Sequence, residues 1–355
     1  MSSALVATYA QFPFTLVDGR GSRVRDSQGR EYWDLYGGHA VTVIGNSHPA
    51  VARAMYEQAQ RLAFYSNVVP LEVRTRAAAA LAAFAAPGLE HVFFCNSGTE
   101  ANENALKIAL LLSGRTRLAG VRGGWHGRSI LALSVTTDDK LTRPFEPLLC
   151  ESVKLAPNDV AGLSLIDERV AAVILEPVQS MAGVVEMSAE FLKALRRRCD
   201  ATGALLIYDE VQTGVGRLGR PFVAGEHGVL PDMVTTAKGL ANGIPIGAVI
   251  MTPAVAGRLK TGDLGTTFGG GPLPCAALLA TLGEIEREGL LDHAAEFGRH
   301  AHALLRVGPV REVLGRGCLI GLRMADAKVA QRQLFELGFI TGTSVDPAVL
   351  RLLPA

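Results

Sequence analysis

The strongest constraint on the fold comes from short apolar runs that stop abruptly at polar residues. The run 205–208 is followed at once by Asp209, and a second run, 232–237, stops just before Lys238. Each run is too short for a typical helix, so each predicts a buried strand whose end opens onto a site. In open α/β sheets, ligands bind beyond the carboxyl ends of the strands. Asp209 and Lys238 are therefore candidates for a shared ligand site.

From residue 91 onward, such runs alternate with helical patterns. Residues 92–95 and 171–175 are typical of strands, whereas 99–112 carries an apolar helical stripe that Gly114 can end. A further helix is expected between Ser188, its candidate N-cap, and Gly203. This alternation predicts an α/β fold, in which helices flank a mostly parallel sheet.

The two ends of the chain show a different pattern. Candidate strands at 14–17 and 31–35, with turn signals between them, predict a hairpin-like N-terminal arm. Long helices over 275–288 and 292–305 and short strands over 318–324 and 350–353 are expected after Pro274. These elements indicate a second, smaller α+β domain, which the N-terminal arm joins.

We therefore divide the chain into an N-terminal arm (1–48), a large ligand-binding domain (49–272) and a C-terminal small domain (273–355). A chain of 355 residues is long enough for two such domains with buried cores.

Composition excludes several classes of function. The chain has 35 basic and 34 acidic residues, so it offers no electrostatic case for binding nucleic acid or a membrane surface. Its five cysteines are scattered without CxxC spacing, which argues against a disulfide framework and a metal site. Residues 1–6 do not resemble a signal peptide, and no apolar run is long enough to span a bilayer. We therefore expect a cytoplasmic protein.

The pairing of a carboxylate with an amine suits one cofactor in particular, pyridoxal phosphate. The amine of Lys238 would form a Schiff base, and the carboxylate of Asp209 would keep the pyridine nitrogen protonated. The alternative is that the two residues are an ordinary surface acid and an ordinary surface lysine.

A candidate phosphate site lies between the predicted strand at 92–95 and the helix that follows. Gly98 allows a tight turn, and the free amides of Gly98 and Thr99 at a helix N-terminus can bind an anion. A capping box between Ser97 and Glu100 is the alternative, and it is compatible with anion binding.

Three other segments contain candidate site residues. Trp125 can stack on a planar ring, and Arg128 can bind a carboxylate with two parallel hydrogen bonds, although a core aromatic and a solvated arginine are the alternatives. Glu176 ends another strand on the same edge, unless it forms a structural ion pair. The loop that holds Thr267 has hydroxyls and open backbone that can bind a phosphate.

Taken together, these segments resemble the class III, pyridoxal-phosphate-dependent aminotransferases, and most closely the acetylornithine aminotransferases. The resemblance runs from about residue 14 to the last residue and rests on six motifs in the family's order and spacing. The motifs are SGTEAN (97–102), WHGR (125–128), EPVQ (176–179), DEVQTG (209–214), KG (238–239) and TTFGG (266–270). The resemblance implies a fold-type-I enzyme of two domains and a homodimer with shared active sites.

The resemblance also assigns roles to single residues. Lys238 matches the lysine that binds the cofactor and moves the substrate proton, Asp209 the carboxylate on the pyridine nitrogen, and Gln212 the partner of the ring hydroxyl. Further cofactor contacts are implied for Ser97, Gly98, Thr99, Trp125 and Glu176, and for Thr267 from the neighbouring subunit. Arg128 and Arg351 match two arginines that bind substrate carboxylates.

One departure from the family pattern concerns the substrate side. After EPVQ, the ornithine and acetylornithine enzymes usually have Gly-Glu, and that glutamate pairs with the C-terminal arginine. Here Ser180 and Met181 stand in its place, so we expect Arg351 to lack this partner and to be permanently available to carboxylates. The family also carries a final helix beyond the position of Ala355.

The implied reaction is ping-pong transfer of an ω-amino group from N-acetylornithine, or a similar acylated ornithine or lysine, to 2-oxoglutarate, as in arginine or lysine biosynthesis. Small amino acids and 2-oxo acids are then the partners, and no nucleic acid or membrane is expected. The alternatives are another ω-amine donor such as succinylornithine, 4-aminobutyrate or ornithine, a pyridoxal-phosphate aminomutase, and a non-catalytic protein that has kept the fold.

Overall fold

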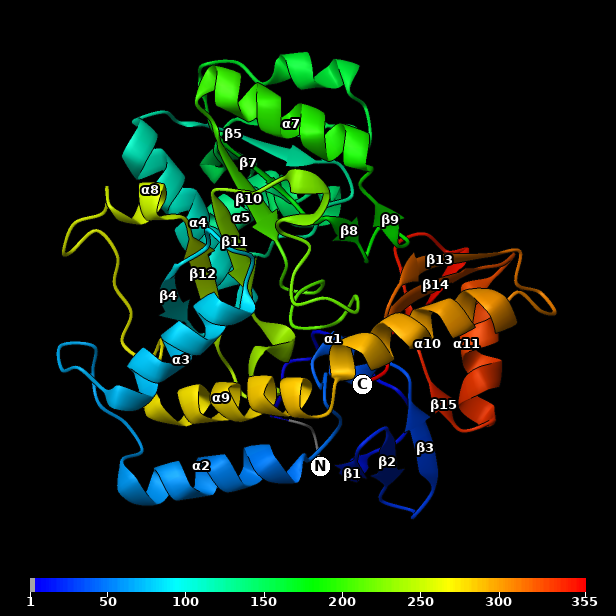
Figure 1. Ribbon diagram of the computed structural model, residues 1–355. Coiled ribbons are helices and arrows are strands. Elements are labelled where there is room, and N and C mark those ends of the chain that lie inside the picture. The colour runs from blue at the N-terminus through cyan, green and yellow to red at the C-terminus, as the bar shows by residue number, and fades with distance from the viewer. Residues whose placement is uncertain (1–3) are drawn as a thin grey trace.

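The computed structural model describes residues 4–355 and is built around a sheet of seven strands (Figure 1). The strand order is β4-β12-β11-β10-β7-β5-β6. Only β12 runs antiparallel to its neighbours, β11 and β4, and the other pairs are parallel. The strands are β4 (His91–Cys95), β5 (Arg117–Val121), β6 (Ser152–Leu155), β7 (Val170–Leu175), β10 (Leu205–Asp209), β11 (Met233–Thr236) and β12 (Gly247–Met251). The prediction of a mostly parallel sheet is confirmed.

Helices cover both faces of this sheet, which explains why its strands are apolar throughout. In β7, Ala172 and Ile174 face the core that contains α4 (Gly98–Ser113), whereas Val173 and Leu175 face the opposite core. The opposite core contains residues from α3 (Glu72–Phe84), α7 (Ala189–Thr202) and α9 (Pro272–Arg287).

The caps of α4 and α7 agree with the sequence analysis. The hydroxyls of Ser97 and Ser188 accept hydrogen bonds from the backbone at Glu100 and Phe191, respectively. Gly114 (φ +67°) and Gly203 (φ +72°) end these helices in the left-handed conformation, which glycine adopts without strain.

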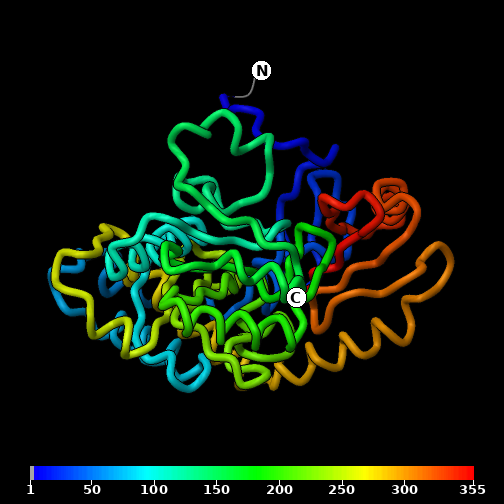
Figure 2. Tube along the Cα trace, turned by 90° about the horizontal axis from the view of Figure 1, so that it is seen from above, coloured from blue at the N-terminus to red at the C-terminus, as the bar shows by residue number. Residues whose placement is uncertain are grey.

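The C-terminal segment forms a second unit with a sheet of its own, in the order β13-β14-β17-β16. Its elements are α10 (Leu290–Leu304), β13 (Glu312–Arg316), β14 (Leu319–Arg323), α11 (Ala327–Glu336), β15 (Phe339–Ile340), β16 (Gly342–Thr343) and β17 (Val349–Leu352). The strand β15 leaves this unit and pairs with β3 (Glu31–Asp34) from the N-terminus. The blue N-terminal strands therefore lie beside the orange and red C-terminal segment (Figure 2).

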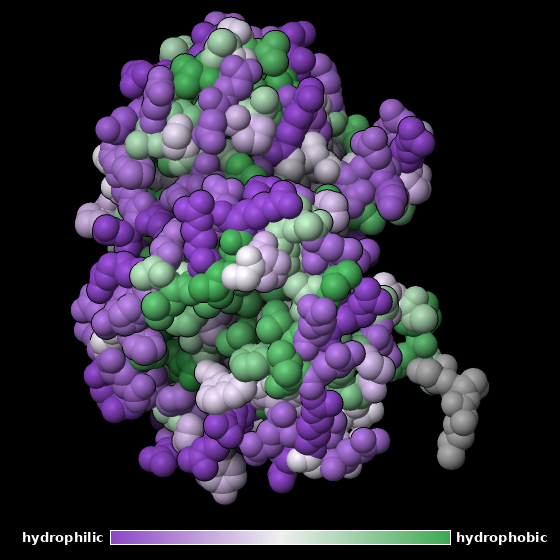
Figure 3. Space-filling view, turned by 90° about the vertical axis from the view of Figure 1, so that its right-hand side faces the viewer, coloured by the Kyte–Doolittle hydropathy of each residue, from purple (hydrophilic) through white to green (hydrophobic). Residues whose placement is uncertain are grey.

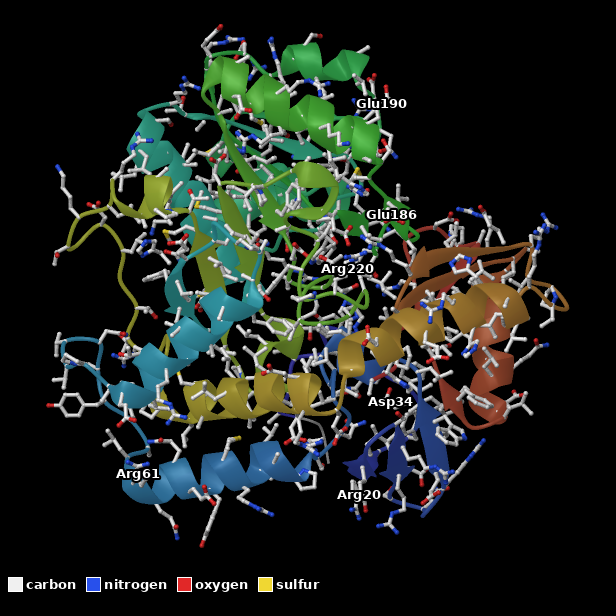
Figure 4. All side chains as sticks on the ribbon, viewed as in Figure 1. Arg20, Asp34, Arg61, Glu186, Glu190 and Arg220 are labelled. Carbon is white, nitrogen blue, oxygen red and sulfur yellow. The ribbon has the colours of Figure 1, made fainter. Side chains whose placement is uncertain are left out.

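The division at residue 272 stays a prediction. The helix α9, which that division assigns to the small domain, packs against α2 (Pro49–Arg61) and α3. Ion pairs join the two units farther along the chain, because Arg316 of β13 contacts both Glu186 and Glu226. Glu186 and Arg220, labelled in Figure 4, lie on the side of the large unit that faces the small one.

The first predicted strand, 14–17, was wrong in its position. The structure has β1 at Leu16–Arg20, followed by a turn at Gly21 (φ +58°) and by β2 (Arg23–Asp26). The residues Asp18 and Gly19, expected in the turn, therefore belong to the strand. The remaining elements are short: α1 (Gly37–Ala40), α5 (Ile130–Val135), α6 (Asp139–Thr142), α8 (Pro253–Ala256), β8 (Val178–Gln179), β9 (Val185–Glu186) and four 3-10 turns, Arg143–Leu148, Ala161–Leu165, Glu226–Gly228 and Lys238–Ala241.

Within residues 4–355, none of the helices combines the length and the apolar character that crossing a membrane requires. Figure 3 shows the side of the molecule that carries the small unit, where apolar side chains gather in a hollowed centre and polar ones surround them.

Candidate active site

Five parallel strands bring their carboxyl ends to one edge of the large sheet. Because β12 is antiparallel to both β4 and β11, these two strands run parallel to each other and to β10, β7 and β5. The predicted site residues follow these strand ends: Ser97 to Thr99 after β4, Trp125 to Arg128 after β5, Glu176 after β7, Asp209 at the end of β10 and Lys238 after β11. The geometry expected from the apolar runs is therefore present.

A cavity of about 460 Å³ lies at this edge. Seven of the predicted site residues line it: Ser97, Gly98, Thr99, Trp125, Arg128, Asp209 and Lys238. The surface-residue alternative for the acid and the lysine is thus wrong, since Asp209 is only 3% exposed and both residues face the same cavity.

The N-terminus of α4 forms one wall of this cavity. The Ser97 hydroxyl accepts a hydrogen bond from the Glu100 amide (3.2 Å), and the Glu100 carboxylate accepts one from the Asn96 amide (2.7 Å). These caps leave the amides of Gly98 and Thr99, which line the cavity, for an anion. A side chain at position 98 would meet Val211, since a Cβ there would lie 2.7 Å from its Cγ1.

Asp209 is held in place by a dense set of hydrogen bonds. Its Oδ2 lies 2.7 Å from Nδ2 of Asn102 and 2.8 Å from Nδ1 of His126, and its Oδ1 accepts from the Val211 amide (3.1 Å). An ionised carboxylate can only accept, so the His126 proton is on Nδ1. Three hydrogen-bond donors therefore fix the position of this carboxylate.

Lys238 is the first residue of a short 3-10 turn and has φ +38°. Such a backbone conformation is costly for a residue with a side chain, and it places this amine at the cavity. Burial lowers the pKa of the Lys238 ammonium, and the nearby positive charge of Arg351 adds to this, while Asp209 and Glu176 oppose it. A lowered pKa increases the fraction of free amine, which is the nucleophilic form.

Glu176 lies behind the cavity wall, with 6% of its surface exposed. Its Oε1 accepts a hydrogen bond from the Trp125 amide (2.7 Å), which fixes the loop that holds the aromatic ring. Burial and the neighbouring Asp209 carboxylate raise the pKa of Glu176 to about 7. Among residues 4–355 it forms no ion pair, so the structural ion-pair alternative is wrong.

Trp125 and Arg128 lie together at the mouth of the cavity. The Arg128 guanidinium is exposed and lies 5.6 Å from the centre of the Trp125 ring. Trp125 is half-buried and lines the cavity, so it is not a core aromatic. A planar ligand and a carboxylate can both be bound here.

Besides Glu176 and Arg351, three further predicted residues lie outside the cavity wall. Gln212 is buried, and its Oε1 has no hydrogen-bond partner among residues 4–355. Thr267 is exposed, in a loop that the Asn67 side chain ties down through the carbonyls of Thr266 and Gly269. The carbonyl of Met181 accepts from the Val345 amide (2.8 Å), and the role of its side chain stays a prediction.

Arg351 is a buried cation with neutral partners. It is 2% exposed, its Nε donates to the Thr343 carbonyl (2.8 Å), and its Nη1 donates to the Ser180 hydroxyl (2.8 Å). Within the described chain no carboxylate forms an ion pair with it. Burial lowers the pKa of Arg351 to about 10. Its predicted contact with a substrate carboxylate remains a proposal.

The sequence analysis missed several polar residues of the site. Asn102 and His126 line the cavity and contact Asp209. Both belong to recognised motifs, SGTEAN and WHGR, in which roles were predicted only for neighbouring residues. His39 was also missed: it belongs to a left-handed turn, its Nδ1 lies 2.6 Å from the Tyr36 hydroxyl, and burial with the nearby positive charge of Lys238 lowers its pKa to about 3. The unusual pair of glycines before His39 was the only available signal.

Known proteins resemble this chain over nearly its whole length. The model of the family described as aminotransferase class-III matches residues 5–355. Two similar proteins are the acetylornithine aminotransferases of Methanopyrus kandleri (45% identical, covering 91% of this chain and 84% of the relative) and of Archaeoglobus fulgidus (38% identical, covering 99% and 92%).

Solved structures agree. An ornithine aminotransferase from Toxoplasma gondii superposes with a TM-score of 0.91 at 31% identity and covers 99% of this chain and 87% of its own. An aminotransferase from Bacillus anthracis gives a TM-score of 0.88 at 27% identity, with coverage of 96% and 88%.

Proposed function

The chain belongs to the class III aminotransferases, which are pyridoxal phosphate enzymes, and we propose that it transfers the ω-amino group of N-acetylornithine, or of a similar acylated ornithine or lysine, to 2-oxoglutarate. The observation that carries this proposal is the meeting of Lys238, Asp209 and the α4 N-terminus in one cavity. The choice of donor rests on the relatives, which are named acetylornithine aminotransferases at 38–45% identity.

The residues of this cavity fit pyridoxal phosphate. The amides of Gly98 and Thr99 suit its phosphate, the Asp209 carboxylate its pyridine nitrogen, and Lys238 its carbonyl carbon. The unpartnered, buried Oε1 of Gln212 suits the ring hydroxyl. When bound, the cofactor supplies a reactive carbonyl and a ring that accepts electron density from the substrate.

Two protein groups hold and move charge in the reaction we propose. Lys238 would hold the cofactor through Nζ, and as a free amine the same Nζ would take and return the proton at the reacting carbon of the substrate. Its lowered pKa favours the free base that this step needs. The Asp209 carboxylate is held in place by three donors and would pair with the pyridine nitrogen.

Two arginines are positioned to bind the carboxylates of the substrates. Arg128 lies at the mouth of the cavity, beside Trp125. Arg351 lies outside the cavity wall, buried on β17 of the small unit, and its positive charge acts on Lys238. A dicarboxylate such as 2-oxoglutarate or glutamate can use both, whereas an acylated ornithine has one carboxylate and a neutral far end.

We also propose a homodimer in the cytoplasm, in which Thr267 reaches the phosphate of the neighbouring subunit. Large apolar side chains are exposed beside this loop: Phe268 is 64% exposed, and its ring lies 5.2 Å from that of Phe64, itself 42% exposed. A second copy of the chain would cover them. The five free cysteines are consistent with a reducing compartment.

The proposal is tested by half-reactions of the purified enzyme, loaded with pyridoxal phosphate, with one amine at a time. N-acetylornithine and glutamate should each remove the visible absorption band of the lysine-bound cofactor, while 4-aminobutyrate should not. Loss of the band with glutamate alone would keep the aminotransferase and refute the donor. A variant with Lys238→Ala serves as the control, because it cannot form the starting bond.

A further inference from the structure

The side chain of Asn102 joins three segments of the cofactor site, because it contacts Asp209, the His126 carbonyl and Thr235. Asn102 lies on α4, one turn beyond the amides of Gly98 and Thr99, and is 1% exposed. Its Nδ2 lies 2.7 Å from Asp209 Oδ2 and 2.7 Å from the carbonyl of His126. Its Oδ1 accepts from the hydroxyl of Thr235 (2.6 Å), which stands on β11, three residues before Lys238.

The amide of Asn102 has only one orientation that satisfies these contacts. Both groups on its Nδ2 side, the Asp209 carboxylate and a backbone carbonyl, can only accept hydrogen bonds. The Thr235 hydroxyl on the other side therefore donates to Oδ1. If the amide turned over, its oxygen would face two acceptors in a buried environment, which is strongly unfavourable.

His126 completes the arrangement around the carboxylate. Its Nδ1 donates to the same oxygen of Asp209, and the ring is 2% exposed. The backbone of His126 is held as well, since its amide donates to the Thr136 hydroxyl (3.0 Å). Both donors to Oδ2 are therefore themselves held by buried contacts.

We propose that Asn102 is a positioning residue of the cofactor site, which Thr235 orients, and that it keeps the Asp209 carboxylate aimed at the pyridine nitrogen. This one amide links three elements of the site: α4, whose N-terminus would bind the phosphate, β10, which ends in Asp209, and β11, which precedes Lys238. It therefore fixes their positions relative to one another. The inference rests on the proposed cofactor site but not on the identity of the amino donor.

The test compares buried variants with matched controls in the apo and cofactor-loaded protein. Asn102→Ala removes the amide, and Thr235→Val removes only the hydroxyl that orients it. The controls are Asn104→Ala, which removes an amide bonded to the Glu100 carbonyl on the same helix, and Thr236→Val, whose buried hydroxyl has no partner within residues 4–355. The readouts are the dissociation constant of pyridoxal phosphate and the pH midpoint of its visible band.

Asn102→Ala should weaken cofactor binding about 10- to 100-fold and shift the pH midpoint, because the charged Asp209 loses a buried donor. Thr235→Val should also weaken cofactor binding, but by a smaller factor. The loss of affinity in the double variant Asn102→Ala/Thr235→Val should be smaller than the product of the two single losses. The controls should stay within about twofold of the wild type.

Asn102→Asp provides a test with a distinct signature. An ionised aspartate would face the Asp209 carboxylate and the His126 carbonyl, whereas a protonated one can still donate. Its deficit in cofactor affinity relative to the wild type should therefore shrink between about pH 8 and about pH 6.

Three outcomes would overturn the inference. The first is an Asn102→Ala protein with unchanged affinity and midpoint. The second is a Thr235→Val protein whose cofactor affinity and pH midpoint equal those of Thr236→Val. This outcome can be measured even if the Asn102→Ala variant fails to fold. The third is a wild-type protein that does not bind the cofactor, which alone would refute the proposed function as well.

Discussion

Replacing Arg351 by glutamine should remove most of the affinity for dicarboxylates. The guanidinium is 2% exposed and has only neutral partners, and burial lowers its pKa from its usual range to about 10. At 1.36 kcal/mol per pKa unit, this fall corresponds to about 3 kcal/mol of unfavourable burial that a bound carboxylate can relieve. An interaction of about 3 kcal/mol is worth roughly a hundredfold in affinity.

The assay is the glutamate half-reaction, followed by the loss of the visible cofactor band at increasing glutamate concentration. We expect the apparent dissociation constant of glutamate to rise about 100-fold in Arg351→Gln, and by less in Arg351→Lys, which keeps the charge but not the forked geometry. The melting temperature should not fall, since the neutral glutamine removes the cost of burying the charge.

The matched control is Arg323→Gln. Arg323 stands on the neighbouring strand β14, opposite Val349, is 38% exposed and pairs with Glu312 and Asp346 at the surface. Its replacement should leave the glutamate constant within about twofold. An Arg351→Gln enzyme whose constant stays within about threefold of the wild type would refute the assignment of Arg351 as a carboxylate site.

Three further predictions concern Met181, Glu176 and Thr267. Met181→Glu should raise the glutamate constant about tenfold by giving Arg351 a competing carboxylate, and an unchanged constant would contradict the availability of Arg351. In Glu176→Gln, the free energy of unfolding should depend less on pH. In the wild type, burial and the Asp209 carboxylate raise the pKa of Glu176 to about 7, so the native state binds more protons than the unfolded state and stability should fall as the pH rises toward 7. Urea titrations that give the same pH dependence for both proteins would contradict this. If the proposed dimer forms, which sedimentation tests, Thr267→Ala should weaken cofactor binding about tenfold. Equal affinities of variant and wild type would refute the contribution from the partner subunit.

The sequence predicted the parts of the site that lie at the ends of elements. Asp209 and Lys238 each follow a short apolar run, and the parallel arrangement of β10 and β11 brings such ends to one edge. The caps of α4 were equally clear, because serine before a helix and glycine after it act locally. These inferences needed no knowledge of distant contacts.

Contacts between distant segments were beyond the sequence analysis. The helical pattern of α4 does not distinguish a buried Asn102, bonded to Thr235 133 positions away, from a surface asparagine. The pairing of Arg351 with Ser180 spans 171 positions, and it depends on how the two units are joined. The antiparallel direction of β12 could not be predicted either, since a fully apolar run is typical of buried parallel and antiparallel strands alike.

The central claim is that Lys238 is the residue that binds the cofactor. The direct measurement is reduction of the loaded enzyme with borohydride, which makes the bond permanent, followed by digestion and mass spectrometry of the labelled peptide. Lys154 is the internal comparison, because burial lowers its pKa to about 8, yet its Nζ donates to the carbonyls of Ser134 and Thr136. The account predicts the label on the peptide that contains Lys238. A label on Lys154 or on another lysine, or no label in a protein that binds the cofactor, would contradict it.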